Sequence, residues 1–196
     1  VDAAAGRDPL PAFSAAFDAY AAALALTPRD PNLHTGRGIA RHRLGILLAA
    51  RSADPAPHYR ASIADHGEAL RLDPGYVNAW NNRATALRNL ADHEAAQGRD
   101  PRPLLAQALA DIDEVVRRRV DTADARCNRG DVRVSLARAR MAAQEDAGAD
   151  LRAALEDYAA AADATHDPYG VHSGSAQAHL LLADLLGPRA GEGPCR

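Results

Sequence analysis

The sequence predicts an all-helical, right-handed solenoid of about eight helices stacked as antiparallel hairpins. Three observations indicate this fold class: an internal period of 46 residues, apolar residues spaced three and four apart, and proline-containing joints between apolar segments. Alanine occupies 47 of the 196 positions, whereas phenylalanine and tryptophan together supply three. The core must therefore rely on closely approaching backbones, because a large aromatic centre is excluded.

The repeat is visible as positions that return every 46 residues with the same kind of side chain. One position always carries leucine, at Leu44, Leu90, Leu136 and Leu182. Another always carries a small residue, at Gly38, Ala84, Gly130 and Ala176. Four such units span about 184 residues, so we expect similar supersecondary units stacked on one another.

Each unit is expected to contain two helices. Phe17, Tyr20 and Leu24 are spaced three and four apart, which places them on one helical face. Joints such as Asp54–Pro57 are expected to start a helix, because aspartate can cap it and proline suits its first turn. The expected helices cover residues 11–27, 31–51, 57–72, 75–97, 103–119, 122–145, 149–165 and 169–186.

A single repeat domain is expected over residues 1–196. It is divided into a half-repeat at 11–28, repeats at 31–74, 75–121 and 122–168, a second half-repeat at 169–187 and a tail at 188–196. The first residue is Val1 rather than methionine. From this we expect either that a leader was removed or that the chain is a segment of a longer one.

Two runs of residues resemble the helices of a tetratricopeptide repeat. Asn78–Leu90 is similar to the first helix, with Trp80 at the family's aromatic position, and Ser62–Pro74 is similar to the second, with Ala69 at its alanine position. The resemblance covers nearly the whole chain, although the family's unit has 34 residues and each unit here has about 12 more. The lengthened repeats, with joints like Gly98–Pro101, also resemble arrays appended to some bacterial serine/threonine kinases.

Several function classes are excluded by charge and by missing motifs. All 23 basic residues are arginines and 26 acids give a net charge of −3, so no nucleic-acid partner is expected. The most apolar stretch, Leu10–Leu26, is short and contains Asp18, so no membrane insertion is expected. No phosphate loop, zinc motif or nucleophile elbow is present, so we expect no enzyme, no catalytic residue and no cofactor.

The cysteines and histidines form no metal-binding or disulfide pattern. Cys127 and Cys195 have no CxxC spacing, and no histidine pair has a third ligand at zinc-like spacing, so no metal site is expected. His66 shares its repeat position with Tyr20 and Tyr158. We therefore expect His66 to be buried in the core, hydrogen-bonded and neutral.

Arginine and aspartate recur together at two further repeat positions. The arginines are Arg37, Arg83 and Arg129, and the aspartates are Asp65, Asp111 and Asp157. Both positions lose their charge in the end half-repeats, at Ser175 and Ala19. This pattern predicts ion pairs inside each repeat that fix the helix register: Arg37 with Asp65, Arg83 with Asp111, and Arg129 with Asp157.

The resemblance also implies a place for a ligand. In tetratricopeptide arrays the first helices of successive repeats line a concave groove, and the corresponding positions here are polar. The implied peptide-binding residues are Thr35, Arg43, Asn78, Asn81, Thr85, Arg88, Asn89, Asp124, Asp131 and Ser135. The family's best-known clamp for a terminal carboxylate uses lysine, which this chain lacks, so that specificity is not expected. An ordinary hydrated polar face is the alternative.

The two end helices are unusually apolar for the ends of a repeat array, which normally present polar outer faces. Residues 10–26 and residues 171–186 carry one formal charge each, Asp18 and Asp184. Both helices are therefore expected to contact another molecule or another part of a longer chain. The expected contact residues are Phe13, Phe17, Tyr20, Leu24, Leu181, Leu182 and Leu185.

The order of helix types favours self-association. Each repeat begins with one helix, here called the first type, and continues with a second helix, here called the second type. The chain starts with a helix of the second type and ends with a helix of the first type. The tail of one copy and the head of the next can therefore complete one repeat. We therefore expect a scaffold that contacts copies of itself head to tail and forms a fibre or a ring. The alternatives are a peptide-binding adaptor or regulatory module of a longer chain such as a kinase, and a self-contained monomer. An adaptor implies the cytoplasm, whereas a fibre subunit permits an extracellular location.

Overall fold

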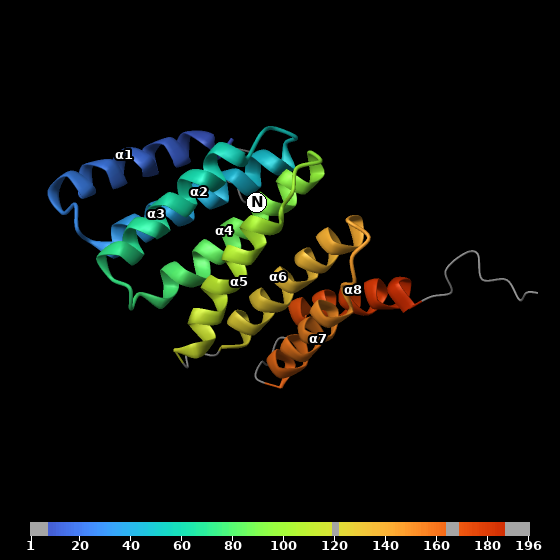
Figure 1. The fold of residues 1–196 in the computed structure, drawn as a ribbon. Coiled ribbons are helices and arrows are strands. Elements are labelled where there is room, and N and C mark those ends of the chain that lie inside the picture. The colour runs from blue at the N-terminus through green and yellow to red at the C-terminus, as the bar shows by residue number, and fades with distance from the viewer. Residues whose placement is uncertain (1–7, 119–121, 164–168, 187–196) are drawn as a thin grey trace, which may run out of the picture. The chain divides into compact units, whose positions relative to one another are not determined.

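The computed structural model describes residues 8–118, 122–163 and 169–186, and of Tyr169 and Gly170 it describes only the backbone. In these ranges it contains eight helices and no strand, which confirms the all-helical prediction (Figure 1). The helices are α1 (Leu10–Leu26), α2 (Pro31–Ala50), α3 (Ala56–Leu72), α4 (Val77–Ala96), α5 (Arg102–Arg117), α6 (Ala123–Ala142), α7 (Gly148–Ala162) and α8 (Tyr169–Leu186).

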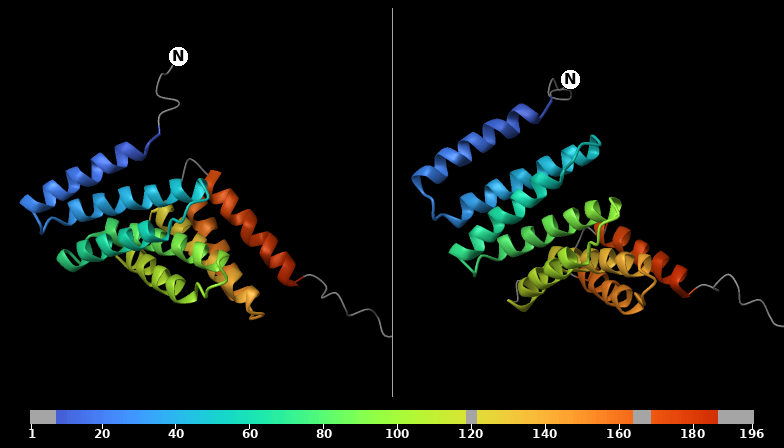
Figure 2. Two further views of the ribbon diagram at one scale, coloured as in Figure 1. Left: turned by 90° about the horizontal axis from the view of Figure 1, so that it is seen from above. Right: turned by 45° about the horizontal axis from the view of Figure 1, so that its top comes forward.

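The chain divides into two compact units. The N-terminal unit, Val1–Gln97, contains α1 to α4, and the C-terminal unit, Gly98–Arg196, contains α5 to α8. Within each unit, consecutive helices run antiparallel and pack side by side (Figure 2). The boundary falls inside the repeat predicted at 75–121, between α4 and α5. The predicted division into a single domain with three repeats remains a prediction.

Aspartate residues begin the helices at the Asp-Pro joints. The Asp54 carboxylate accepts a hydrogen bond of 2.9 Å from the Ala56 amide, and the Asp146 carboxylate accepts one of 2.8 Å from the Gly148 amide. Asp8 and Asp100 make the same contact two residues ahead. Each aspartate therefore satisfies an amide that the first turn of a helix leaves without an intrahelical partner.

The helices of the first type end at a repeated backbone feature. The helices α2, α4 and α6 end at Ala50, Ala96 and Ala142, and two residues later Ser52, Gly98 and Gln144 have positive φ angles of 58°, 73° and 60°. A residue in the left-handed region cannot continue a right-handed helix. This is why α6 ends at Ala142, three residues earlier than the sequence predicted. The other predicted boundaries lie within three residues of those observed.

The core is built from small side chains, as the composition indicated. About half of the buried apolar residues in the described ranges are alanines. In the C-terminal unit, Leu151, Tyr158 and Val171 belong to a buried cluster that includes alanine at several positions. Close backbone approach through small residues therefore positions the helix faces on which function depends.

Candidate functional site

Asp65 joins two helices of the N-terminal unit through two arginines. Arg37 of α2 donates from Nη2 to Oδ1 at 2.6 Å and from Nε to both oxygens at 3.1 Å. Arg41, one turn later, donates to Oδ2 at 2.7 Å. The side chain of Asp65 is only 4% exposed, so α2 and α3 are held in register by a nearly buried carboxylate.

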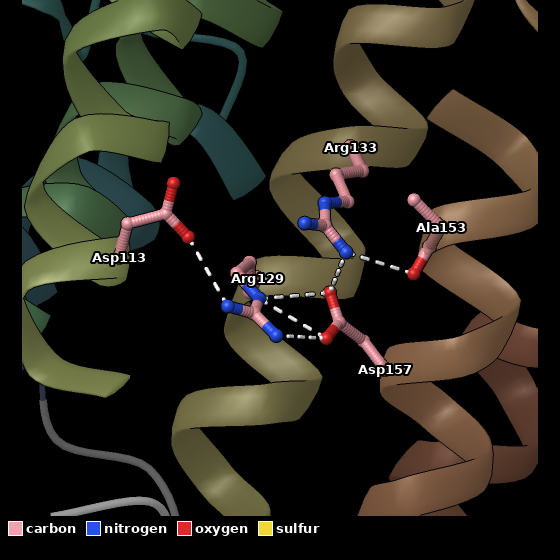
Figure 3. A network of polar contacts seen from close by, with 5 residues as sticks. All are labelled: Asp113, Arg129, Arg133, Ala153 and Asp157. Carbon is pink, nitrogen blue, oxygen red and sulfur yellow. Dashed lines mark hydrogen bonds and ion pairs between the residues drawn. The ribbon is translucent and has the colours of Figure 1, made fainter. Parts of the chain in front are cut away.

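Asp157 forms the same cluster in the C-terminal unit (Figure 3). Arg129 donates to Oδ1 at 2.5 Å and Arg133 donates to Oδ2 at 2.6 Å. Arg133 also donates to the carbonyl of Ala153 at 2.9 Å, and Arg129 reaches Asp113 of α5 at 3.1 Å. Three helices of this unit are therefore tied to one buried carboxylate and its arginines.

Two of the three predicted ion pairs are thus confirmed, Arg37 with Asp65 and Arg129 with Asp157. The pair of Arg83 with Asp111 joins residues of different units and remains a prediction. The sequence interpretation missed Arg41 and Arg133. A signal was present, because these arginines recur after two repeats and follow the first arginine by one helical turn. The clusters link helices within a unit and are structural in nature.

Tyr158 of α7 is enclosed between two helices that flank it. A Cβ added to Gly130 of α6 would lie 2.7 Å from the Tyr158 ring, and one added to Gly174 of α8 would lie 2.5 Å from it. The ring therefore rests directly on two glycine backbones, and its hydroxyl donates to Asp131 at 2.8 Å. Tyr158 is 1% exposed.

Tyr20 of α1 holds the same repeat position but has such a contact on one side only. A Cβ added to Gly36 of α2 would lie 2.6 Å from the Tyr20 hydroxyl, which corresponds to the contact of Gly174 with Tyr158. Whereas α7 packs against both α6 and α8, α1 packs against α2 alone within the part of its unit that the structure describes, at the edge of that unit (Figure 2). Tyr20 consequently remains half-exposed.

A pocket of about 350 Å³ lies between α1 and α2 where that second contact is lacking. Most of its lining is apolar, and Arg43 is its one charged residue. It brings together residues that the sequence assigned to two different surfaces, because Phe13 and Tyr20 were expected in a self-contact and Arg43 in a peptide groove. The lining residues are Pro9, Ala12, Phe13, Ala16, Tyr20, Gly36, Ile39, Ala40 and Arg43.

The last described helix has a comparable uncovered face. Leu180 of α8 corresponds to Val134 of α6 one repeat earlier, yet Leu180 is 67% exposed and Val134 only 3%. Ala176 and Ala183 are likewise exposed, although their counterparts in α6 are buried. A different set of leucines, Leu181, Leu182 and Leu185, packs partly against the core of the C-terminal unit.

The other residues predicted for self-contact lie on α1. Phe13 and Phe17 are half-buried and stack on each other, with ring centroids 6.4 Å apart, whereas Leu24 is buried. Leu26, near the end of the helix, is 85% exposed. Among the predicted contact residues of α1, Phe13, Phe17 and Tyr20 therefore retain the most accessible apolar surface.

The residues predicted for a peptide groove are divided between the two units and differ in exposure. In the N-terminal unit, Arg43 and Asn78 are exposed, whereas Thr35 is buried. In the C-terminal unit, Asp124 is exposed, Asp131 is half-buried and Ser135 is buried. The half-exposed remainder are the α4 residues Asn81, Thr85, Arg88 and Asn89.

Several groove candidates already make contacts inside the fold. Asn89 hydrogen-bonds the His42 ring of α2 at 2.8 Å, and the Thr85 hydroxyl donates to the Asn81 carbonyl at 3.1 Å. Arg88 pairs with Asp92 at 3.3 Å. The Asn89 contact links α4 to α2 and the other two contacts lie within α4, and the predicted role of these residues in peptide binding remains a prediction.

His66 is buried as predicted, but the expected hydrogen bond is absent. It is 0% exposed, and neither ring nitrogen has a hydrogen-bond partner among the described residues. A Cβ added to Gly38 would lie 2.8 Å from the ring. Burial lowers the pKa of His66 to about 4, with smaller contributions from His42 and Arg83, so the ring is neutral near pH 7.

The cysteine in the described ranges is not activated as a nucleophile. Burial, reinforced by nearby aspartates, raises the pKa of the Cys127 thiol, which disfavours the reactive thiolate. Cys195 lies outside the described residues. No group of three or more histidine, cysteine or acidic residues is placed to hold a metal in the described ranges, and no helix there is apolar and long enough to cross a bilayer.

Sequence comparison agrees with this architecture over the segment from α3 to α4. No curated protein matches the chain at a significant level. Residues 67–98 match the family model of the tetratricopeptide repeat, which covers the end of α3 and all of α4 and is typical of non-enzymatic protein-interaction modules.

Proposed function

We propose that the protein is an interaction scaffold that associates with copies of itself head to tail, with α8 of one copy packing against α1 and α2 of the next. The supporting observation is the difference between Tyr158, which is enclosed by a helix on each side, and Tyr20, which has a helix on one side and a pocket on the other. In the C-terminal unit α6 packs against α7, and the corresponding position beside α1, the counterpart of α7, is open in the N-terminal unit. The helix α8 is the counterpart of α6 one repeat later.

The repeat spacing predicts which residues meet in this contact. Gly130 contacts Tyr158, which lies 28 residues later in the chain. The position 28 residues after Ala176 lies four repeats of 46 residues beyond Tyr20, so it corresponds to Tyr20 of the next copy. Ala176 is therefore expected to contact that tyrosine. By the same reasoning from Gly45 and Tyr59, Ala183 contacts Phe13. Because alanine replaces glycine at both places, α1 is expected to lie slightly farther from α8 than α7 lies from α6.

Leu180 provides the sharpest test, since it is 67% exposed and lies on the face of α8 that the contact covers. Fully burying a leucine contributes about 1.5–3 kcal/mol, so the exposed part of Leu180 contributes roughly 1–2 kcal/mol. Leu180→Asp should therefore weaken association about 5- to 30-fold. Because the side chain is exposed, helix content measured by circular dichroism should stay unchanged.

Leu26→Asp is the matched control. Leu26 is 85% exposed and lies about 120° around α1 from Tyr20, away from the pocket. Sedimentation velocity should therefore show the control assembling like the original protein. If the original protein stays monomeric at roughly 1 mM, where a contact of about −4 kcal/mol would be half formed, the proposal is wrong.

A peptide-binding adaptor, either alone or within a longer chain such as a kinase, is the second candidate. It is favoured by the pocket itself, where the exposed Arg43 lies beside the apolar Phe13 and Tyr20 and has no ion-pair partner among the described residues. This arrangement suits a peptide that ends in an apolar residue with a free carboxylate. An adaptor should bind such peptides but not their amidated forms, remain monomeric, and lose binding on Arg43→Ala.

A further inference from the structure

Arg43 and Asp184 are charged residues on the two surfaces that the proposed self-association would bring together. Arg43 is exposed and is the one charged residue that lines the apolar α1–α2 pocket. Asp184 is exposed near the end of α8 and carries the only formal charge between Val171 and Leu186. Neither side chain has an ion-pair partner among the described residues. An unpaired charge beside a large apolar surface is costly to cover unless an opposite charge meets it.

Contacts already present between helices of the first type indicate where these charges would lie. Asn89 of α4 contacts His42 of α2, 47 residues earlier. Leu181 packs against the cluster that contains Val134, again 47 residues earlier. The same spacing of 47 residues, applied to Leu180, leads to a position four repeats of 46 residues beyond Arg43. In a head-to-tail array that position is Arg43 of the next copy, which is therefore expected beside Leu180.

A second contact leads to the same place. Arg138 of α6 donates to Gln177 of α8 at 3.2 Å. One repeat later these two positions are Asp184 and Ile39 of the next copy. Ile39 lies one turn before Arg43 on α2, and Leu180 lies one turn before Asp184 on α8. Both relations therefore bring Asp184 within about one helical turn of Arg43, which a long arginine side chain can span.

We propose that Asp184 of one copy forms an ion pair with Arg43 of the next and thereby determines the register and the head-to-tail polarity of the contact. This inference rests on the proposed self-association. Like charges facing each other across an interface suppress the wrong pairing, so a single unlike pair selects α8 against α1–α2 over α8 against α8.

Charge reversal tests the pair directly, because each single variant creates a like-charge contact with its own copies. Arg43→Asp would set two carboxylates against each other, and Asp184→Arg would set two guanidinium groups against each other. Each variant should therefore associate about tenfold more weakly than the original protein. In an equimolar mixture, a copy of one variant can contact a copy of the other. Such a contact sets neither two negative charges nor two positive charges against each other.

In that mixture, one kind of contact pairs the reversed residues with each other, aspartate at position 43 with arginine at position 184, and restores an unlike pair. The other kind pairs the original Arg43 with the original Asp184, which is also an unlike pair. Sedimentation velocity should therefore show that mixing restores assembly, with the two variants alternating.

Two controls match these changes in net charge at exposed positions away from both surfaces. Arg71→Asp alters α3 and Glu156→Arg alters α7. Both should assemble like the original protein, alone and mixed. Circular dichroism of each variant checks that the helices are retained.

The possible outcomes separate the inference from the proposed function. If the original protein assembles and both single variants assemble equally well, self-association stands and the ion pair is wrong. If the single variants are weakened but their mixture is not restored, the ion pair is also wrong. An original protein that remains monomeric overturns the self-association and the ion pair together.

Discussion

Replacing Asp157 by asparagine should strongly destabilise the C-terminal unit. Asp157 is 4% exposed and accepts hydrogen bonds from Arg129 and Arg133, whose side chains are each 20% exposed. Asparagine has nearly the same shape as aspartate, but it would leave two partly buried guanidinium groups facing a neutral amide. Removing one partner of a buried ion pair costs about 3–5 kcal/mol, and the partial exposure of the arginines reduces this to roughly 2–4 kcal/mol.

Asp113→Asn is the matched control, because Asp113 contacts the same Arg129 at 3.1 Å but is 51% exposed. An exposed pair contributes at most about 1 kcal/mol, so this variant should be nearly as stable as the original protein. The assay is urea unfolding followed by circular dichroism at pH 7. The reasoning is refuted if the two variants differ in unfolding free energy by less than about 0.5 kcal/mol.

Two further predictions concern glycine contacts and pH. Gly67→Ala should stabilise by about 0.5–1 kcal/mol, since the nearest atom to an added Cβ is 3.7 Å away, whereas Gly130→Ala should destabilise by up to about 2 kcal/mol because its Cβ would meet the Tyr158 ring. Equal thermal shifts for both variants would contradict this. Burial lowers the pKa values of His66 and His42 to about 4, so the unfolded chain binds more protons than the folded one between about pH 4 and pH 6.5. The free energy of unfolding should have its full value above about pH 6.5 and decrease towards pH 4, and His66 should account for about 3 kcal/mol of this decrease. His66→Leu should flatten this dependence, and an unchanged slope in urea titrations would contradict it.

The fold was predictable because the helical signal repeats. Four copies of the same apolar spacing and the same joints indicated eight helices, and errors in one copy were corrected by the others. The predicted end of α6 lies three residues beyond the observed one, because Gln144, which takes a left-handed conformation, is not a residue type that marks such a turn. Its counterpart Gly98 carries the signal clearly, so comparison across the repeat would have located the end.

The candidate surfaces were only partly predictable. The sequence placed polar residues on one face of each helix, but exposure depends on the neighbouring helices as well. Thr35 is therefore buried although its counterpart Asn81 is half-exposed. In α8 the sequence selected Leu181, Leu182 and Leu185 as contact residues, and these pack partly inward, whereas the neighbouring Leu180, which was not selected, is exposed. Neighbouring leucines point in different directions because they differ by about 100° around the helix.

The two aspartate clusters have a consequence for anyone who wishes to change the length of this protein. Asp65 and Asp157 each receive two arginines and are separated by 92 residues, whereas the intermediate repeat has Leu87 in place of the second arginine. The natural module for insertion or deletion is therefore a pair of 46-residue repeats rather than one repeat. A graft of 92 residues would preserve the alternation between repeats that carry the second arginine and repeats that lack it. A graft of 46 residues would set two repeats of the same kind next to each other.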